Sequence, residues 1–135
     1  MSGSALFIWP VRVYWEDTDA GGVVYYANYL KFLERARTEW LSALGLEQDH
    51  LAREEGVVFV VRRVEADYLR PARFNDRLLV ESRLETLKRA SMAMAQRILR
   101  GQEVLLEARV QVACVAQADF RPAKIPASVS LAFNP

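Results

Sequence analysis

Residues 16–29 read Glu-Asp-Thr-Asp-Ala-Gly-Gly-Val-Val-Tyr-Tyr-Ala-Asn-Tyr, and the rest of the chain is best understood outward from them. Two carboxylates, Asp17 and Asp19, follow a strand-like segment at 11–15. The Gly21–Gly22 pair then allows a sharp turn, because glycine adopts positive φ angles without a Cβ clash. A carboxylate that faces a helix N-terminus can act as base or nucleophile, while the free N–H groups of the helix attract developing negative charge. The stretch therefore predicts a reactive site between this turn and a following helix.

Residues 28–44 have the clearest periodic pattern in the chain. Apolar side chains recur at helical spacing, at Tyr29, Leu30, Phe32, Leu33, Ala36, Trp40, Leu41 and Leu44. This wide stripe predicts an amphipathic helix with Asn28 as N-cap and Gly45 just past its end. At about 1.5 Å per residue the helix is roughly 25 Å long. A stripe this broad indicates a helix that a sheet encloses.

Alternating apolar and polar residues predict strands along most of the remaining chain. The predicted strands are residues 57–69, 78–87, 91–100 and 103–115, with a further strand at 7–15 that Pro10 breaks. Gly101–Gln102 is predicted to join the last two as a hairpin. In the strand at 57–69, the side chains of Val64, Ala66 and Tyr68 are expected to face the core.

Two segments outside the strands carry weaker patterns. Residues 47–55 predict a short helical turn or loop that closes at Gly56, and residues from 119 onward predict an irregular tail. One long helix with mostly antiparallel strands predicts the α+β class. No repeat or linker divides the chain, so residues 1–135 are predicted to form a single domain.

Composition narrows the classes of function. A net charge of +1 gives no strong basic field for nucleic acid, and apolar runs that charges interrupt predict no membrane span. The N-terminus carries no secretory signal pattern. The single cysteine, Cys114, allows no internal disulfide and favours a reducing compartment. These features predict a cytoplasmic protein.

Three groups of residues resemble the signature of the hotdog-fold acyl-CoA thioesterases. They are Asp-Thr-Asp-Ala-Gly-Gly-Val-Val-Tyr at 17–25, Asn-Tyr at 28–29 and Glu-Arg-Ala-Arg-Thr-Glu-Trp at 34–40. The likeness is to the 4-hydroxybenzoyl-CoA thioesterase type, and within it to small bacterial enzymes associated with the Tol-Pal system. Weaker landmarks follow at residues 68–76, 96–98 and 113–115. The resemblance implies a hotdog fold, in which an antiparallel sheet wraps around one long central helix.

The resemblance also implies the roles of the motif residues. Asp19 matches the catalytic carboxylate, and the backbone N–H of Tyr26 matches the oxyanion donor, whereas Asp17 is interpreted as structural. Many Tol-Pal-associated relatives carry histidine where this chain has Tyr26. Because an oxyanion donor needs only its main chain, tyrosine is compatible with hydrolysis, but it argues against proton transfer by that side chain.

Substrate contacts follow from the same likeness. Gly22, Val24 and Tyr25 are predicted to contact the substrate, and Lys88 and Arg89 to bind the phosphates of coenzyme A. The aromatic rings of Tyr25, Tyr26 and Trp40 suit either a benzoyl ring or a short aliphatic acyl group. The predicted reaction is hydrolysis of acyl-CoA to a carboxylic acid and free CoA, without a metal or other cofactor.

Other titratable residues are weaker candidates. Glu34 is the second choice for the catalytic carboxylate, since some hotdog enzymes place theirs on the central helix; a salt-bridged residue on the helix surface beside Arg35 and Arg37, or a residue at a subunit contact, is the simpler reading. His50 is expected to be a solvated surface residue, and Cys114 a buried small apolar side chain. One histidine and one cysteine far apart give too few ligands for zinc.

Two alternatives remain open at this point. One is a hotdog acyl-thioester dehydratase, which the missing central histidine disfavours. The other is a binding module for acyl-CoA or acyl carrier protein, and acyl carrier protein is also an alternative carrier of the hydrolysed thioester. The resemblance further implies assembly through sheet edges into a homodimer or homotetramer, with the active site between subunits.

Overall fold

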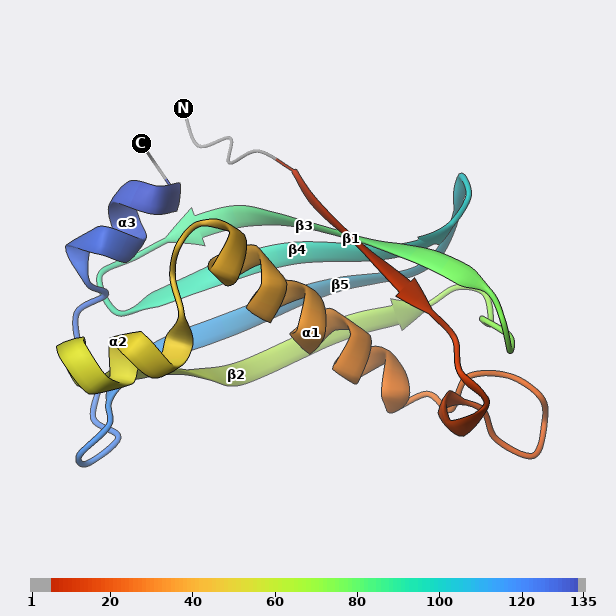
Figure 1. The fold of residues 1–135 in the computed structure, drawn as a ribbon, viewed down its shortest axis with the longest axis horizontal. Helices are drawn as coiled ribbons and strands as arrows, with labels where there is room; N and C mark the ends of the chain where they lie inside the picture. Colours follow the sequence, from red (N-terminus) through yellow and green to blue (C-terminus); the bar gives the residue numbers. More distant parts are fainter. Residues whose placement is uncertain (1–5, 134–135) are drawn as a thin grey trace.

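One antiparallel sheet and one long helix form the body of the protein in a computed structural model, which describes residues 6–133 (Figure 1). The strands are β1 (Phe7–Arg12), β2 (Val57–Tyr68), β3 (Arg77–Leu87), β4 (Ser91–Arg100) and β5 (Glu103–Ala116). Their spatial order is β1-β3-β4-β5-β2. The helices are α1 (Asn28–Ala43), α2 (Gln48–Glu55), α3 (Ala127–Phe133) and the short 3-10 helix η1 (Trp15–Asp17). Figure 1 shows α1 lying across one face of the sheet, which confirms the predicted α+β hotdog layout.

The apolar stripe of α1 is buried against the sheet. Its buried members are Tyr29, Phe32, Leu33, Ala36, Trp40 and Leu41. Gly45 follows the helix with a φ of 81°, which confirms the predicted C-terminal stop. The predicted N-cap is wrong: Ala27 occupies that position, and the amide of Asn28 instead donates to the main-chain oxygen of Asp17. The cap is replaced by a contact that ties the helix start to the motif turn.

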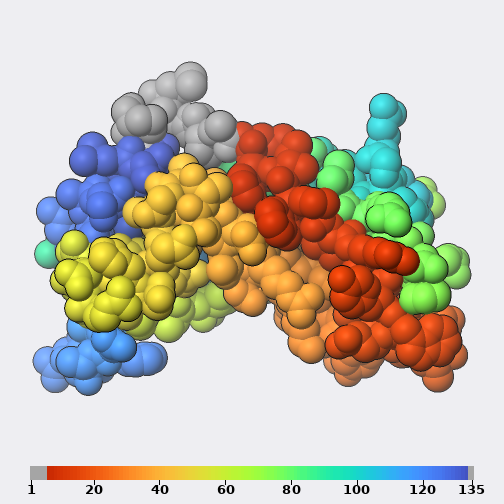
Figure 2. Space-filling model, in the orientation of Figure 1, coloured from red at the N-terminus to blue at the C-terminus, as the bar shows by residue number. Residues whose placement is uncertain are grey.

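The first strand differs from its prediction at both Pro10 and its end. β1 passes through Pro10, which pairs with Leu79, because β1 is an edge strand and the proline needs no ladder partner on its open side. The strand ends at Arg12, and residues 15–17 form the 3-10 helix η1. Asp17 is therefore the last residue of a helical turn rather than the residue after a strand, and Asp19 follows it two positions later. Figure 2 shows this segment at the end of the molecule opposite α2 and α3.

β2 is the second edge strand, and its exposure was predicted wrongly. The strand exists as expected and pairs with β5, with an irregularity between Val61 and Arg63. Val64 and Tyr68 are nevertheless 37% and 46% exposed, on a strand that has a neighbouring strand on one side only within residues 6–133. The exposed apolar side chains leave a surface along β2 that a second molecule could cover.

The C-terminal segment is not the irregular tail that was predicted. Residues 127–133 form α3, which buries Val129 and Phe133. The ring of Phe133 packs edge-on against Trp40 with centroids 5.1 Å apart. The segment at 48–55 is likewise a regular helix, α2, and it ends at Gly56 with a φ of 69°. Both helices close the end of the core around the last turns of α1.

No helix within residues 6–133 combines the length and the apolar character needed to cross a membrane.

Candidate active site

The motif turn is a tight hairpin that precedes α1. The N–H of Asp19 donates to the carbonyl oxygen of Val23 at 2.9 Å, and the N–H of Gly22 donates back to the carbonyl oxygen of Asp19 at 3.0 Å. Thr18 and Val24 form a bridge below this turn. Gly22 has a φ of 79°, a conformation that side-chain-bearing residues rarely adopt. The turn therefore brings the chain back alongside Asp17 and Asp19 just before the helix begins.

Asp17 has a structural role. Its side chain is buried, and its Oδ2 accepts the backbone N–H of Tyr14 at 2.8 Å. Its main-chain oxygen accepts the N–H of Tyr25 at 3.0 Å and the side-chain amide of Asn28 at 2.9 Å. These bonds fasten the hairpin to the start of α1, in agreement with the interpretation of Asp17 as structural.

The carboxylate of Asp19 is exposed at the tip of the hairpin. Its Oδ1 accepts the N–H of Gly21 at 2.8 Å, and a Cβ at position 21 would lie only 3.2 Å from that oxygen. No hydrogen bond to Oδ2 occurs within residues 6–133. Tyr26 is the main cause that raises the pKa of Tyr25, through a hydrogen bond and its charge, and the Asp19 carboxylate adds to this shift. Asp19 thus lies close enough to Tyr25 to act on its hydroxyl electrostatically.

The first residues before α1 leave main-chain donors unused. In the described part of the chain, the N–H of Tyr26 donates no backbone hydrogen bond, whereas the N–H of Asn28 donates to Tyr25 at 2.8 Å. Tyr26 is held on both sides, because the Tyr25 carbonyl, which shares a peptide plane with the Tyr26 N–H, accepts that Asn28 bond, and the hydroxyl of Tyr68 donates to the Tyr26 carbonyl oxygen at 3.0 Å. A fixed, unpaired N–H at a helix start is a suitable donor for an anionic oxygen.

An aromatic cavity of about 290 Å³ opens beside these donors. It is lined by Val24, Tyr26, Tyr29, Tyr68, Leu69, Arg70 and Pro71. The rings of Tyr29 and Tyr68 pack edge-on with centroids 5.4 Å apart. Of the predicted site residues, Val24 and Tyr26 line this cavity, whereas Gly22 and Tyr25 are exposed and outside its wall.

The aromatic residues that line this cavity are not all the ones that the sequence predicted. Tyr68, Leu69 and Arg70 were quoted only as landmarks of the resemblance, although aromatic and apolar residues at a strand end carried a signal for a pocket wall. Trp40 was expected near the acyl group, but it is 3% exposed and packs in the core against Phe7. Its position in the apolar stripe of α1 was the stronger signal.

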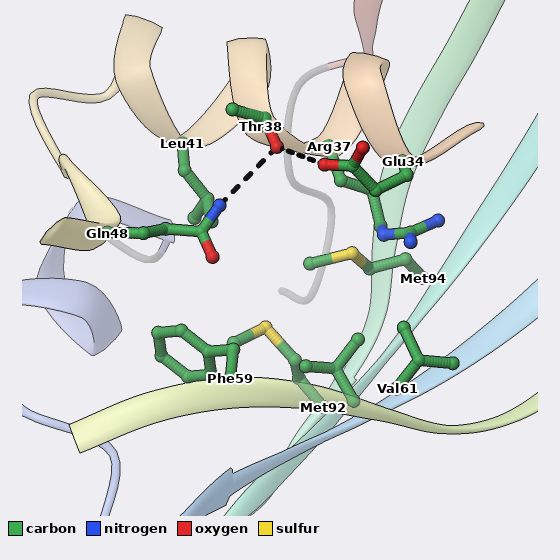
Figure 3. Close-up of a pocket in the computed structure, with 10 residues that line it drawn as sticks. Glu34, Arg37, Thr38, Leu41, Gln48, Phe59, Val61, Met92 and Met94 are labelled. Atoms are coloured by element: carbon green, nitrogen blue, oxygen red, sulfur yellow. Dashed lines mark hydrogen bonds between the residues drawn. The ribbon is translucent and has the colours of Figure 1, made fainter. Parts of the chain in front are cut away.

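A second cavity, of about 150 Å³, lies between α1 and β2 (Figure 3). It is lined by Glu34, Arg37, Thr38, Leu41, Gln48, Phe59, Val61, Met92, Met94 and Val112. The hydroxyl of Thr38 donates to Glu34 at 2.7 Å, and Gln48 reaches the same hydroxyl at 3.5 Å. Glu34 forms no ion pair within residues 6–133, so the expected salt bridge on the helix surface is wrong within one chain, whereas the alternative of a subunit contact stays a prediction.

Lys88 and Arg89 lie at the other end of the sheet from Asp19. They follow β3, whose first residue, Arg77, pairs with Arg12 just ahead of the motif turn. The ten residue steps from Arg77 to Leu87 span roughly 33 Å of extended strand. One chain therefore does not bring the predicted phosphate-binding residues to the predicted catalytic residues.

A third cavity, of about 130 Å³, surrounds Lys88 and is mostly polar. Arg62 and Arg109 also line it, together with Thr86, Ser91 and Gln111. Arg109 is ion-paired with Glu85 at 2.7 Å, but Arg62 and Lys88 form no ion pair within the described range. Arg89 is outside the lining, and its main-chain oxygen accepts the N–H of Ile125.

His50 and Cys114 lie as the sequence predicts. His50 is exposed on α2. Cys114 is fully buried, and burial raises the pKa of its thiol. Nowhere between residues 6 and 133 do three His, Cys, Asp or Glu side chains gather closely enough to hold a metal ion.

Known proteins resemble this chain over nearly its whole length. Acyl-CoA thioesterase YbgC of Haemophilus influenzae is 45% identical over 128 residues, which cover 95% of this chain and 94% of that protein. Acyl-CoA thioester hydrolase YbgC of Escherichia coli O6:H1 is 44% identical over 132 residues, covering 97% and 98%. The crystal structure of a probable thioesterase from Bartonella henselae matches with a TM-score of 0.86 at 38% identity, covering 90% of this chain and 100% of that chain.

A long helix against a five-stranded antiparallel sheet, together with relatives named as thioester hydrolases at 44–45% identity, defines the class of hotdog-fold thioester hydrolases. The sequence model of the thioesterase-like superfamily matches residues 13–133. The chain belongs to this superfamily.

Proposed function

We propose that the protein is an acyl-CoA thioesterase whose chemistry takes place between Asp19 and the N–H of Tyr26. The observation that carries this proposal is the exposed Asp19 carboxylate beside a helix start whose Tyr26 N–H donates no backbone hydrogen bond within residues 6–133. The two YbgC relatives are named for acyl-CoA thioester hydrolysis, which supports the same reaction here.

In the proposed mechanism, the thioester carbonyl oxygen accepts a hydrogen bond from the N–H of Tyr26. The positive end of the α1 dipole adds to this stabilisation as negative charge develops on the oxygen. Asp19 either attacks the carbonyl carbon or removes a proton from an attacking water. The carbon–sulfur bond then breaks, CoA leaves as its thiol, and water supplies the oxygen and protons of the carboxylic acid and the thiol.

The acyl group is proposed to be short or aromatic. The cavity beside Tyr26 has walls of tyrosine, and aromatic rings pack well against such walls through edge-on contacts. The hydrolysis of a panel of acyl-CoA thioesters, followed by release of free thiol, tests the reaction and ranks the acyl groups. Binding without thiol release would favour an acyl-CoA or acyl-carrier-protein binding module, and hydration of an enoyl thioester would favour a dehydratase.

The unpaired edge of β2 supports assembly of two copies. β2 pairs with β5 on one side only within residues 6–133, and a twelve-residue open edge with exposed apolar side chains tends to pair with another strand. Antiparallel pairing of two β2 strands would place the Tyr68 end of one copy beside the Val57 end of the other. Val57 of β2 and Ser91 of β4 pair with the same end of β5, so the turn that carries Lys88 lies at the Val57 end of β2. The Lys88 turn of one copy would therefore approach the Tyr68 end of its neighbour, where Tyr68 contacts Tyr26.

Sedimentation velocity tests this assembly. We expect two or four times the 15.4 kDa mass of one chain. Val64→Lys is expected to weaken the assembly, since a charge on an edge strand opposes pairing. Leu131→Lys, at an exposed apolar residue of α3, should leave the mass unchanged. A wild-type protein that sediments as a single chain would contradict the proposed dimer.

The polar cavity around Lys88 is proposed to hold phosphates of coenzyme A. Its free cations, Arg62 and Lys88, suit such an anion. We expect Lys88→Met to raise the KM for acyl-CoA by about 10-fold, the effect of one hydrogen bond to a charged group. The KM for the matching acyl-pantetheine, which lacks the nucleotide, should not change. Arg53→Met on the exposed face of α2 is the control, and an equal rise for both substrates would contradict this assignment.

A further inference from the structure

Arg37 is a partly buried cation without a carboxylate partner. Burial lowers the pKa of its guanidinium, and the charge of Glu34 opposes this shift. No carboxylate oxygen of residues 6–133 lies within 4.0 Å of the guanidinium. The hydrogen bond it makes is to a neutral acceptor, from Nη1 to Oε1 of Gln96 at 2.9 Å. Buried charges are normally paired, so an unpaired one next to a cavity indicates a ligand.

Gln96 holds Arg37 in a fixed position. Gln96 is 1% exposed, and its Nε2 donates to the main-chain oxygen of Leu33 at 3.1 Å and to Oγ of Ser82 at 2.9 Å. With both amide hydrogens used in this way, the amide oxygen faces Arg37. The guanidinium is therefore anchored on one side and retains further N–H donors that Gln96 does not use.

The cavity in front of Arg37 has the size and lining of an acyl-binding pocket. Its sheet side is apolar, with Phe59, Val61, Met92 and Met94, and Figure 3 shows the guanidinium between α1 and Met94. Its volume is about 150 Å³. An apolar cavity of roughly this volume can hold a benzene ring.

We propose that this cavity binds the distal part of the acyl group, beyond the part next to the thioester that packs against the tyrosines beside Tyr26, and that Arg37 hydrogen-bonds to an oxygen at the far end of that group. The oxygen belongs to a hydroxyl or a carboxylate. A hydroxyl could also donate to Glu34, whereas a carboxylate would rely on Arg37 alone. Arg37 is thus a residue that determines acyl specificity, and the inference rests on the proposed thioesterase function.

The path to this cavity runs between two copies of the chain. Eleven residues, or roughly 16 Å of helix, separate Arg37 from Tyr26 of the same chain, which is more than a short acyl group spans. In the antiparallel β2 pairing proposed above, the Tyr26 end of the second copy approaches the Val57 end of β2, near Phe59. The cavity would then receive the acyl group of a thioester held at the second copy's α1.

Binding of stable thioethers tests the inference without any hydrolysis. The probes are S-pentyl-CoA, S-(5-hydroxypentyl)-CoA and S-(4-carboxybutyl)-CoA, with affinities measured by isothermal titration calorimetry on the wild-type protein. We expect at least one oxygen-bearing probe to bind about 10-fold more tightly than S-pentyl-CoA, as one charge-assisted hydrogen bond allows. The hydroxyl and carboxylate probes show which oxygen Arg37 recognises.

Arg37→Met should reduce this preference to less than about twofold while S-pentyl-CoA binds as before. Arg35→Met, on the exposed side of the same helix, is the matched control. Arg37→Lys retains the charge and serves if the methionine variant fails to fold. Equal wild-type affinity for all three probes, or a preference that survives both Arg37 variants, would overturn the inference.

The two proposals can fail separately. Preferential binding of an oxygen-bearing probe by a protein that releases no thiol from acyl-CoA would retain the role of Arg37 and reject the thioesterase. Thiol release without any probe preference would reject the role of Arg37 alone. Failure of all three probes to bind would contradict both.

Discussion

Asp19→Asn is expected to lower kcat for acyl-CoA hydrolysis by about 10²–10⁴-fold, the usual contribution of a general base. Asparagine keeps an oxygen that can accept the N–H of Gly21, so the hairpin should fold as before. It loses the negative charge needed to attack the carbonyl or to accept a proton from water. KM should change little, because the carboxylate acts on the reacting carbon. Steady-state thiol release measures both constants.

Asp49→Asn is the matched control for this variant. Asp49 lies on the exposed surface of α2, and its contact with Arg53 is a weak surface pair at 4.0 Å. Its activity should equal that of the wild type. An Asp19→Asn enzyme that retains full activity would reject the proposed mechanism, and Glu34→Gln would then test the second candidate carboxylate, which lines the cavity between α1 and β2.

The largest expected loss of stability comes from Phe32→Ala. Phe32 is 1% exposed on α1, and its ring packs edge-on against Tyr29. Removing a buried phenyl ring lowers the free energy of unfolding by about 3–5 kcal/mol, because the transfer energy is lost and a cavity remains. Urea unfolding with linear extrapolation measures the change.

Leu30→Ala provides the comparison on the same helix. Leu30 is 40% exposed, although it belongs to the apolar stripe, and its loss should lower the free energy of unfolding by less than about 1 kcal/mol. Similar losses for Phe32→Ala and Leu30→Ala would mean that α1 is not packed as described. The helix start at Tyr26 would then lack the firm support that the proposed site requires.

The parts of the fold that depend on local patterns could be predicted from the sequence. The apolar spacing along residues 28–44 identified α1, and Gly45 marked its end because only a positive φ continues the chain there. Alternation identified β3, β4 and β5, and Gly101 marked their last hairpin. The motif at residues 17–25 identified the turn that carries Asp19.

The parts that depend on tertiary contacts could not be predicted in this way. α3 is short and becomes stable by packing Phe133 against Trp40, a contact that no local pattern reveals. The alternation in β2 resembled that of a half-buried strand, but β2 lies at the edge of the sheet and its Val64 and Tyr68 are exposed, a position that only the strand order reveals. The hydrogen bond from Arg37 to Gln96 joins residues 59 positions apart, so the sequence around either residue could not predict the contact.

A crystal structure of the Asp19→Asn protein with an intact acyl-CoA is the most direct measurement of the catalytic geometry. The proposed mechanism predicts the thioester carbonyl oxygen about 2.7–3.1 Å from the backbone nitrogen of Tyr26, with the residue 19 side chain facing the carbonyl carbon. A thioester bound away from Tyr26, with Glu34 as the carboxylate nearest its carbonyl, would contradict it.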